Sequence, residues 1–294
     1  MTMKKPILGK PVTLKHLHVL LLISIMGCDK KELPHDIGLN ARPNADNTGI
    51  QKGITLNTFA ENIPVTGNIA AITDSDQIFE NLSFKDPGNG NYYVFYGNNL
   101  ILKNCKIPNG LQVNGTNVKI EHCEVTGGIS CSGAKDVSIL FNNISHFTQG
   151  VYVASDSGQA SNIKIENNFI HTPDPPCEAH SDGIQVRGVK QITIANNTVD
   201  MGPWKQVCGL DAYTAAVFIQ DVNGGNENVM INHNYMNGGG RILLLTRGND
   251  IKITNNRFGR VYQYGVYGND AMPGDITKWE NNVFDDNEEP ITLN

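Results

Sequence analysis

The chain has 294 residues, which is enough for one large domain or two ordinary ones. Its formal net charge is -6, which argues against a nucleic-acid partner because such binders need a basic face. No internal segment is apolar enough to span a bilayer, so we expect no internal transmembrane helix.

The first residues have the pattern of a secretory signal. The lysines Lys4, Lys5, Lys10 and Lys15 precede the apolar run LHVLLLISIMG, which is too short for a comfortable transmembrane helix and ends at Cys28. The stretch IMGC resembles the lipobox of bacterial lipoproteins. This resemblance implies that Cys28 is lipidated and becomes the first mature residue. The alternative is an ordinary signal peptide with a chance cysteine.

We therefore expect three regions. Residues 1–27 form the signal peptide, residues 28–52 a flexible polar tether, and residues 53–294 the folded domain. The signal predicts a protein of the bacterial cell envelope, anchored to the lipid bilayer and facing the periplasm or the exterior. Export to an oxidising compartment permits disulfides.

A repeated pattern runs through the folded domain. Segments such as NIKIENNFI (162–170) share a polar start, alternating apolar residues, an Asn-Asn pair or a substitute, and one apolar residue. This alternation predicts strands with one buried face. A second strand follows each segment, as in GVYVAS (150–155), GIQVRG (183–188), LLLTRG (243–248) and finally PITLN (290–294). Strand pairs repeated without a helical pattern predict a solenoid of β coils.

From about residue 77 to residue 294 the repeats resemble the right-handed parallel β-helix proteins of the pectate-lyase-like superfamily. The resemblance implies an all-β fold, a single right-handed parallel β-helix of about eight to nine coils with an asparagine ladder. A buried amide can bond the turn backbone and its neighbours above and below. The asparagines at the shared repeat position are Asn143, Asn168, Asn197, Asn234, Asn256 and Asn282.

The cysteines of the early coils fit the core. Cys105 and Cys123 occupy the ladder position, where we expect small buried fillers, with a stacked disulfide as the alternative. Cys131 points inward from its strand and is expected in the apolar core.

Unequal spacing between coils marks the functional region. The longest insertions are HTPDPPCEAHS, before the strand at 183, and DMGPWKQVCGLDAYTA, before the strand at 216. Excess residues must leave the solenoid as loops, which often carry function. The two loops lie on one side of adjacent coils, so we expect a Cys177–Cys208 disulfide, with two free thiols as the alternative.

Side chains that alternate along these strands predict an outward row. Five of the six arginines fall between positions 187 and 260. Coils stack about 4.8 Å apart, so Arg187 and Arg247 should lie roughly 10 Å apart with Gln220 between them. Such a row suits carboxylates or sulfates. Alternatively, each arginine pairs with a nearby aspartate and only holds the loops; the candidates are Asp182, Asp211 and Asp221.

The segment CEAHSDGIQVRG (177–188) places titratable residues before a strand of this row. HSDGIQ looks like motifs of carbohydrate-active β-helix proteins. The expected catalytic residues are His180, Asp182, Arg187, Arg247 and Tyr213. The expected substrate-binding residues are Glu178, Gln185, Lys205, Asp211, Gln220, Arg241, Tyr264 and Tyr267. Ca²⁺ is a candidate cofactor through Glu178, Asp182 and Asp211, although no dense acidic cluster supports it.

Three functions fit these residues, each with a polysaccharide partner. A lyase of a uronate polymer would use the arginines to neutralise the acid group, and His180 or Tyr213 to move protons. A glycoside hydrolase would pair Asp182 with Asp211 or Asp221. The Asp-Gly step resembles that of polygalacturonases, but their Asp-Asp pair and Gly-His-Gly motif are absent. The third reading is a non-catalytic glycan-binding or structural surface protein.

Overall fold

The computed structural model describes residues 41–61, 63–271 and 274–293, and the expected signal peptide and Cys28 lie outside them. All regular elements among the described residues are strands. No helix in this part of the chain could cross a membrane.

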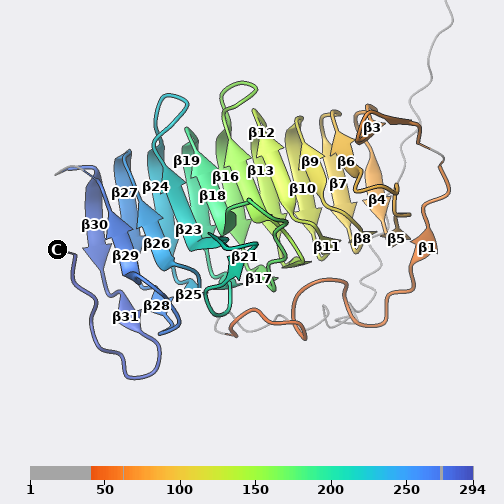
Figure 1. The fold of residues 1–294 in the computed structure, drawn as a ribbon. Coiled ribbons are helices and arrows are strands. Elements are labelled where there is room, and N and C mark those ends of the chain that lie inside the picture. The colour runs from red at the N-terminus through yellow and green to blue at the C-terminus, as the bar shows by residue number, and fades with distance from the viewer. Residues whose placement is uncertain (1–40, 62, 272–273, 294) are drawn as a thin grey trace, which may run out of the picture. The chain divides into compact units, whose positions relative to one another are not determined.

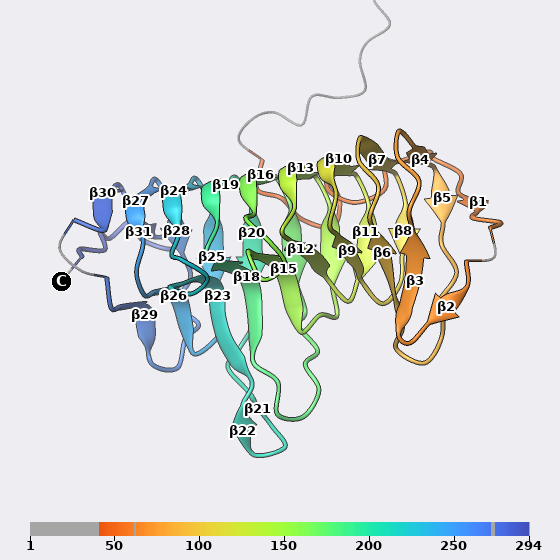
Figure 2. The ribbon, with the colours of Figure 1, turned by 90° about the horizontal axis from the view of Figure 1, so that it is seen from above.

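Three long sheets form the described domain (Figures 1 and 2). Sheet A contains β1 (Asn57–Thr58), β5 (Leu82–Ser83), β8 (Lys106–Ile107), β11 (Glu124–Thr126), β14 (Asn143–Ser145), β17 (Phe169–His171), β20 (Thr198–Asp200), β25 (Tyr235–Asn237), β28 (Arg257–Phe258) and β31 (Val283–Phe284). Sheet B contains β2 (Val65–Thr66), β3 (Ile69–Ile72), β6 (Tyr92–Phe95), β9 (Leu111–Val113), β12 (Ile129–Ser132), β15 (Gln149–Ala154), β18 (Ser181–Arg187), β23 (Tyr213–Gln220), β26 (Arg241–Leu245) and β29 (Gly265–Asn269). Sheet C contains β4 (Ile78–Glu80), β7 (Leu100–Lys103), β10 (Thr116–Glu121), β13 (Lys135–Leu140), β16 (Ser161–Glu166), β19 (Lys190–Ala195), β24 (Glu227–Asn232), β27 (Asn249–Thr254) and β30 (Ile276–Glu280).

Each coil runs from sheet C to sheet A to sheet B and returns to sheet C one level further on. The long sheets are parallel, apart from the β2–β3 hairpin. Inward residues such as Ile163, Ile165, Ile192 and Ile194 are fully buried or nearly so, as the period-2 pattern predicts. The expected all-β parallel solenoid is therefore confirmed.

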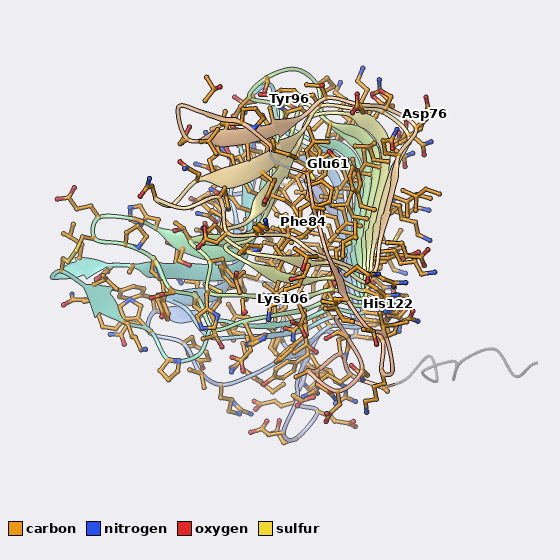
Figure 3. The ribbon with its side chains drawn as sticks, turned by 90° about the vertical axis from the view of Figure 1, so that its right-hand side faces the viewer. Glu61, Asp76, Phe84, Tyr96, Lys106 and His122 are labelled. Carbon is orange, nitrogen blue, oxygen red and sulfur yellow. A yellow bond between two sulfur atoms is a disulfide. The ribbon has the colours of Figure 1, made fainter. Side chains whose placement is uncertain are left out.

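The view along the solenoid shows how the sheets enclose the core (Figure 3). Asp76 lies at the corner before sheet C, His122 lies at the corner after it, and Phe84 points into the interior. Aromatic rings fill the first coils: Phe84 packs against Phe59 and Tyr93, with ring centroids 4.4 and 5.2 Å apart. These rings close the N-terminal end of the described core.

The asparagine ladder lies at the corner between sheets C and A. Each amide accepts a backbone N–H of the preceding coil and donates to a core carbonyl. Asn168 Oδ1, for example, accepts Asn142 N at 2.9 Å, while Asn168 Nδ2 donates to Ile139 O at 2.8 Å. The ladder residues are Asn142, Asn168, Asn197, Asn234, Asn256 and Asn282.

The expected ladder position of Asn143 is wrong by one residue. The ladder residue stands two positions before the first inward residue of the sheet A strand, which is Ile144 in this coil and Ile170 in the next. Counting back from Ile144 gives Asn142, which is fully buried. Asn143 lies instead on the outer face of sheet A, where it accepts a hydrogen bond from His171 at 2.8 Å.

The cysteines of the first coils are buried free thiols, as expected for core fillers. Cys105 and Cys123 continue the ladder position, and Cys105 N donates to Cys123 Sγ at 3.4 Å. Burial raises the pKa of the third thiol, Cys131, to about 12, so it stays protonated.

The C-terminal residues fold over the end of the solenoid. Ile291 is buried, its N–H donates to Asn282 O, and its carbonyl accepts from Trp279 Nε1 at 2.7 Å. The expected final strand at 290–294 is wrong for the residues described there, because Pro290 forms only an isolated bridge with Val283. These contacts cover the open edge of the last coil.

A strap, residues 42–51, lies against the outside of the solenoid. Arg42 pairs with Asp285 of the last coil at 2.5 Å, Gly49 N donates to Phe141 O at 2.8 Å, and Gln51 N donates to Asn104 Oδ1 at 3.1 Å. The strap thus runs from the last coil back to an early one, against the direction of coil growth. It includes most of the described part of the segment expected to be a tether.

The ladder assignment predicts unequal effects of two neighbouring substitutions. Asn142→Ala leaves Cys123 N–H and Ile120 C=O without their amide partner, so it should lower the free energy of unfolding by about 1–3 kcal/mol. Asn143→Ala removes a partly exposed bond and should cost less than about 1 kcal/mol. Urea denaturation of both variants measures this, and equal losses would contradict the assignment.

Candidate functional site

The corners between sheets A and B differ greatly in length. The links are residues 127–128 after β11, 146–148 after β14, 172–180 after β17 and 201–212 after β20. The two-residue link 127–128 is closely packed, because a Cβ on Gly128 would lie 1.9 Å from Gln149 O. The last two links form long loops, and the second carries the hairpin of β21 (Gln206–Val207) and β22 (Leu210–Asp211). Figure 2 shows the hairpin projecting from the solenoid beside the sheet B strands.

A disulfide joins the two long loops. Cys177 and Cys208 are bonded, with Cα atoms 5.4 Å apart, so the structure has the expected disulfide. Tyr213 adds a second link, because its hydroxyl donates to Pro173 O at 2.9 Å. Together these contacts hold both loops at one corner of adjacent coils.

Tyr213 is not placed as the sequence led us to expect. Its side chain is buried, and burial, followed by the charge of Asp174, raises the pKa of its phenol. Its hydroxyl is bonded to Pro173 O, so the side chain points between the loops. The expected position on the rim is wrong, and Tyr213 instead packs the loops together.

Asp182 is also misplaced by the sequence interpretation. β18 begins at Ser181, so Asp182 belongs to the strand and shares the inward side with Ile184 and Val186. Only 1% of the residue is exposed, and its Oδ1 accepts Ala215 N at 3.1 Å. Burial raises the pKa of this carboxyl to about 7. It does not lie on the rim, so the expected pairing with Asp211 or Asp221 for hydrolysis is not formed.

The expected row of Arg187, Gln220 and Arg247 is broken at its third member. Arg187 and Gln220 are neighbours across β18 and β23, as expected. Leu245, expected outside, aligns with buried Ile219, which places Thr246 rather than Arg247 next to Gln220. Arg247 is exposed and pairs with Asp275, with Arg247 Nε 2.7 Å from Asp275 Oδ2.

The same shift of register turns Tyr267 toward the core, and Arg241 bonds to the backbone of the residues that follow. Tyr267 aligns with buried Leu243, packs against the core, and donates its hydroxyl to Thr292 O at 3.0 Å. Its expected place in the outward row is therefore wrong. Arg241 donates to the carbonyls of Tyr267 and Tyr264 at 3.1 and 3.3 Å. It supports the strand and loop that follow.

A cleft of about 350 Å³ lies on the outer face of sheet B. It extends from β6 to β18, beside the tight corners and before the first long loop. All residues that line it are uncharged. Those that offer polar groups or rings from their side chains include Tyr92, Ser130, Thr148, Gln149, Tyr152 and Gln185.

A charged contact adjoins the floor of this cleft. Arg187 Nη1 donates to the hydroxyl oxygen of Tyr152 at 2.5 Å, and the Tyr152 hydroxyl donates to Asp156 Oδ2 at 2.5 Å. Burial, followed by the bond to Asp156, raises the pKa of Tyr152. Burial would raise the pKa of Asp156, but bonds from Tyr152 and Asn223 and the charge of Arg187 hold it below its usual range.

Other expected residues form the rim at the long loops. His180 is exposed, Thr214 Oγ1 lies 3.4 Å from His180 Nδ1, and Gln149 Nε2 of the cleft donates to the His180 carbonyl at 2.9 Å. Asp211 accepts the Tyr264 hydroxyl at 2.5 Å, which lowers the pKa of the carboxyl. The exposed side chains of Lys205 and Glu178 stand on the same loops.

Of the expected residues, Gln185, Gln220 and Arg187 meet on the face of sheet B, where Gln185 Nε2 donates to Gln220 Oε1 at 2.9 Å. Tyr152 and Asp156 were missed. Tyr152 occupies the position of Gln185 one coil earlier, so the alternation in GVYVAS could have found it. No local pattern marks Asp156, because its contact depends on the path of a loop.

The described residues contain no group of three or more histidine, cysteine or acidic side chains able to hold a metal ion. The expected Ca²⁺ ligands illustrate this, because Asp182 is buried while Glu178 and Asp211 are exposed.

Comparison with protein families agrees with this geometry. Residues 49–215 match the family model described as the right-handed β-helix region. The chain belongs to this family. No curated protein matches the sequence of this β-helix.

Several solved structures are similar to this β-helix. A mutant tailspike protein of E. coli bacteriophage HK620, in complex with a pentasaccharide, is 15% identical with a TM-score of 0.49, and the match covers 74% of this chain and 43% of that one. An alginate lyase from Paenibacillus sp. str. FPU-7 is 14% identical with a TM-score of 0.46, and the match covers 72% of this chain and 91% of that one. A GH136 lacto-N-biosidase from Eubacterium ramulus is 12% identical with a TM-score of 0.47, and the match covers 81% of this chain and 53% of that one. The β-helix thus matches less than half of the tailspike chain, and at these identities the similarity concerns the fold alone.

The buried carboxyl of Asp182 predicts a pH-dependent stability of this β-helix. Its folded pKa of about 7 lies above the ordinary value of 3.8, so the folded chain retains the proton longer than the unfolded chain. The associated stability is fully present below about pH 4 and is lost as the pH rises through about 7, by at most about 1.4 kcal/mol per pH unit.

Asp182→Asn should abolish this slope, because asparagine can still accept the Ala215 N–H bond. Urea denaturation of both proteins between pH 4 and pH 8 measures the difference, with the exposed Asp136→Asn as control. Parallel curves for the parent chain and Asp182→Asn would contradict a proton held at Asp182.

Proposed function

We propose that this β-helix binds a polysaccharide along the outer face of sheet B and cleaves it at a uronate residue by β-elimination. The observation that carries the proposal is the contact between Arg187 and Tyr152 beside the cleft. It places a permanent cation and a proton-transferring phenol within one sugar residue of each other.

The cleft has the chemistry of a glycan-binding surface. Its amide and hydroxyl side chains can exchange hydrogen bonds with sugar hydroxyls, and the rings of Tyr92 and Tyr152 offer flat apolar faces. Five neighbouring strands of sheet B contribute to it, which corresponds to about 19 Å of solenoid. An elongated cleft of this kind suits a polymer better than a compact small molecule.

The residues can be assigned to the steps of β-elimination. Arg187 neutralises the uronate carboxylate, which makes the proton on the neighbouring carbon easier to remove. We assign its removal to the Asp156 carboxylate, which contacts both Tyr152 and Arg187 and therefore reaches the same sugar residue. His180 precedes β18, whose other end carries Arg187, so it lies roughly 20 Å from that arginine along the strand. As the carbon–oxygen bond breaks and the double bond forms, Tyr152 donates its proton to the leaving oxygen. The raised pKa of Tyr152 keeps that proton available at neutral pH.

Glycan binding without cleavage is the second candidate. It is favoured by the pairing of Arg187 with Asp156, whose atoms Nη1 and Oδ2 lie 3.8 Å apart, because this leaves the cation partly neutralised. Hydrolysis is less well supported, because Asp182, the shared member of both expected pairs, is buried.

We also propose that the protein is exported and anchored to the bilayer through a lipid on Cys28, facing the periplasm or the cell exterior. The Cys177–Cys208 disulfide supports export, because such bonds persist in oxidising compartments.

The reaction is tested by incubating residues 29–294 with a panel of uronate polymers and following the ultraviolet absorbance of the unsaturated product. On the polymer that is cleaved, Tyr152→Phe should lower kcat by about 100-fold or more, because the proton donor is lost. Arg187→Lys should also lower kcat, because lysine cannot reproduce the guanidinium fork.

Tyr96→Phe is the matched control, because Tyr96 is an exposed tyrosine outside the residues that line the cleft. It should cleave at the parental rate. A cleavage rate unchanged in Tyr152→Phe would exclude the assigned proton donor. Binding of polymers without any unsaturated product would favour the second candidate.

A further inference from the structure

Asp156 occupies the position where a ligand of Arg187 would be expected. It lies in the loop 155–160 between β15 and β16, at the edge of sheet B opposite the disulfide-linked loops. Its Oδ2 accepts the Tyr152 hydroxyl and lies 3.8 Å from Arg187 Nη1. The carboxylate is therefore placed over the cation that we assign to the substrate.

A second loop holds Asp156 in place. Asn223, in the loop 221–226 between β23 and β24, donates its Nδ2 to Asp156 Oδ1 at 2.6 Å. To do so, this loop passes over Gly188, where φ is +68° and a Cβ would lie 2.7 Å from the Asn223 Cβ. Figure 1 shows the two loops projecting from the same edge of the solenoid. Both oxygens of Asp156 are thus engaged, Oδ2 by Tyr152 of β15 and Oδ1 by Asn223 of the second loop.

Arg187 nevertheless keeps an unused donor. Its Nε is buried and has no hydrogen-bond partner within the described structure. A buried N–H without a partner is costly, and it normally finds one. An arginine can bind a carboxylate through two parallel N–H groups, whereas Asp156 faces only Nη1 at 3.8 Å.

We propose that Asp156 is an internal substitute for the substrate carboxylate, which an acidic sugar displaces to reach Nε and a terminal nitrogen of Arg187. This inference rests on the proposed function, because it takes Arg187 as the group that binds the uronate. The ion pair itself opposes displacement only weakly, because 38% of the Asp156 side chain is exposed and partly exposed ion pairs contribute little to stability. A bidentate uronate contact is stronger.

The resulting role is selectivity. With Asp156 in place the cleft floor carries almost no net charge, so a neutral sugar gains nothing from Arg187. An acidic sugar gains a charge-assisted contact only by removing Asp156. Asp156 therefore determines how much more tightly an acidic glycan binds at Arg187 than a neutral one.

The first test measures access to Arg187 without any glycan. Residues 29–294, Asp156→Asn and Asn223→Ala are treated with phenylglyoxal, and modification of each arginine is followed by peptide mass spectrometry. Both variants should modify Arg187 about two- to fivefold faster, the factor equivalent to an exposed ion pair. Arg247 and Arg257, which pair with other acids, serve as internal controls. An unchanged rate at Arg187 would overturn the proposal and leave the proposed function standing.

The second test measures selectivity. Calorimetry compares a uronate trisaccharide with its carboxyl-reduced counterpart on the parent protein and on Asp156→Asn. The variant should bind the acidic trisaccharide about two- to fivefold more tightly and the reduced one equally. An equal gain for both sugars would overturn the selectivity role. Faster modification of Arg187 with no uronate binding to either protein would refute the proposed function and reduce Asp156 to a structural ion pair.

Discussion

The stacking of each coil on the next is the constraint from which the rest of the structure follows. Parallel strands fix the spacing between coils, and the buried amides from Asn142 to Asn282 fix their registration at one corner. Each amide satisfies backbone groups that would otherwise be buried without partners. With one corner held in this way, additional residues can be accommodated only at the other corners. The ladder thereby determines where the chain can vary.

The long loops and the cleft are consequences of that constraint. At the corner between sheets A and B the links grow from two glycines to the disulfide-bonded pair of loops, and the cleft lies beside the short ones. At the corner between sheets B and C, two further loops bring Asp156 and Asn223 together. The flat face of sheet B is therefore bordered on both edges, and Arg187 and Tyr152 lie between them.

The sequence was sufficient to predict the features that repeat from coil to coil. It was insufficient to predict where a strand begins or where its register changes by one residue. Period-2 alternation identified the solenoid, and two insertions in one compartment identified the disulfide. The ladder residue of one coil was misjudged because Asn142 and Asn143 are adjacent, and only the inward position of Ile144 distinguishes them. Asp182 was assigned to the rim because its strand begins earlier than the apolar pattern indicates.

The site was harder to predict than the fold, because it depends on contacts between loops. The outward position of Arg187 followed from alternation, but a shift of one residue in LLLTRG moved Arg247 out of the row. Asp156 and Asn223 lie 67 positions apart, and no local pattern connects them.

The central claim is that a glycan binds on the outer face of sheet B at Arg187 and Tyr152. The most direct test is a crystal structure of residues 29–294 with a bound uronate oligosaccharide. The account predicts a carboxylate on the Arg187 guanidinium, a sugar ring beside Tyr152, and Asp156 displaced from the guanidinium. An oligosaccharide bound elsewhere, with the Asp156–Arg187 contact intact, would contradict it.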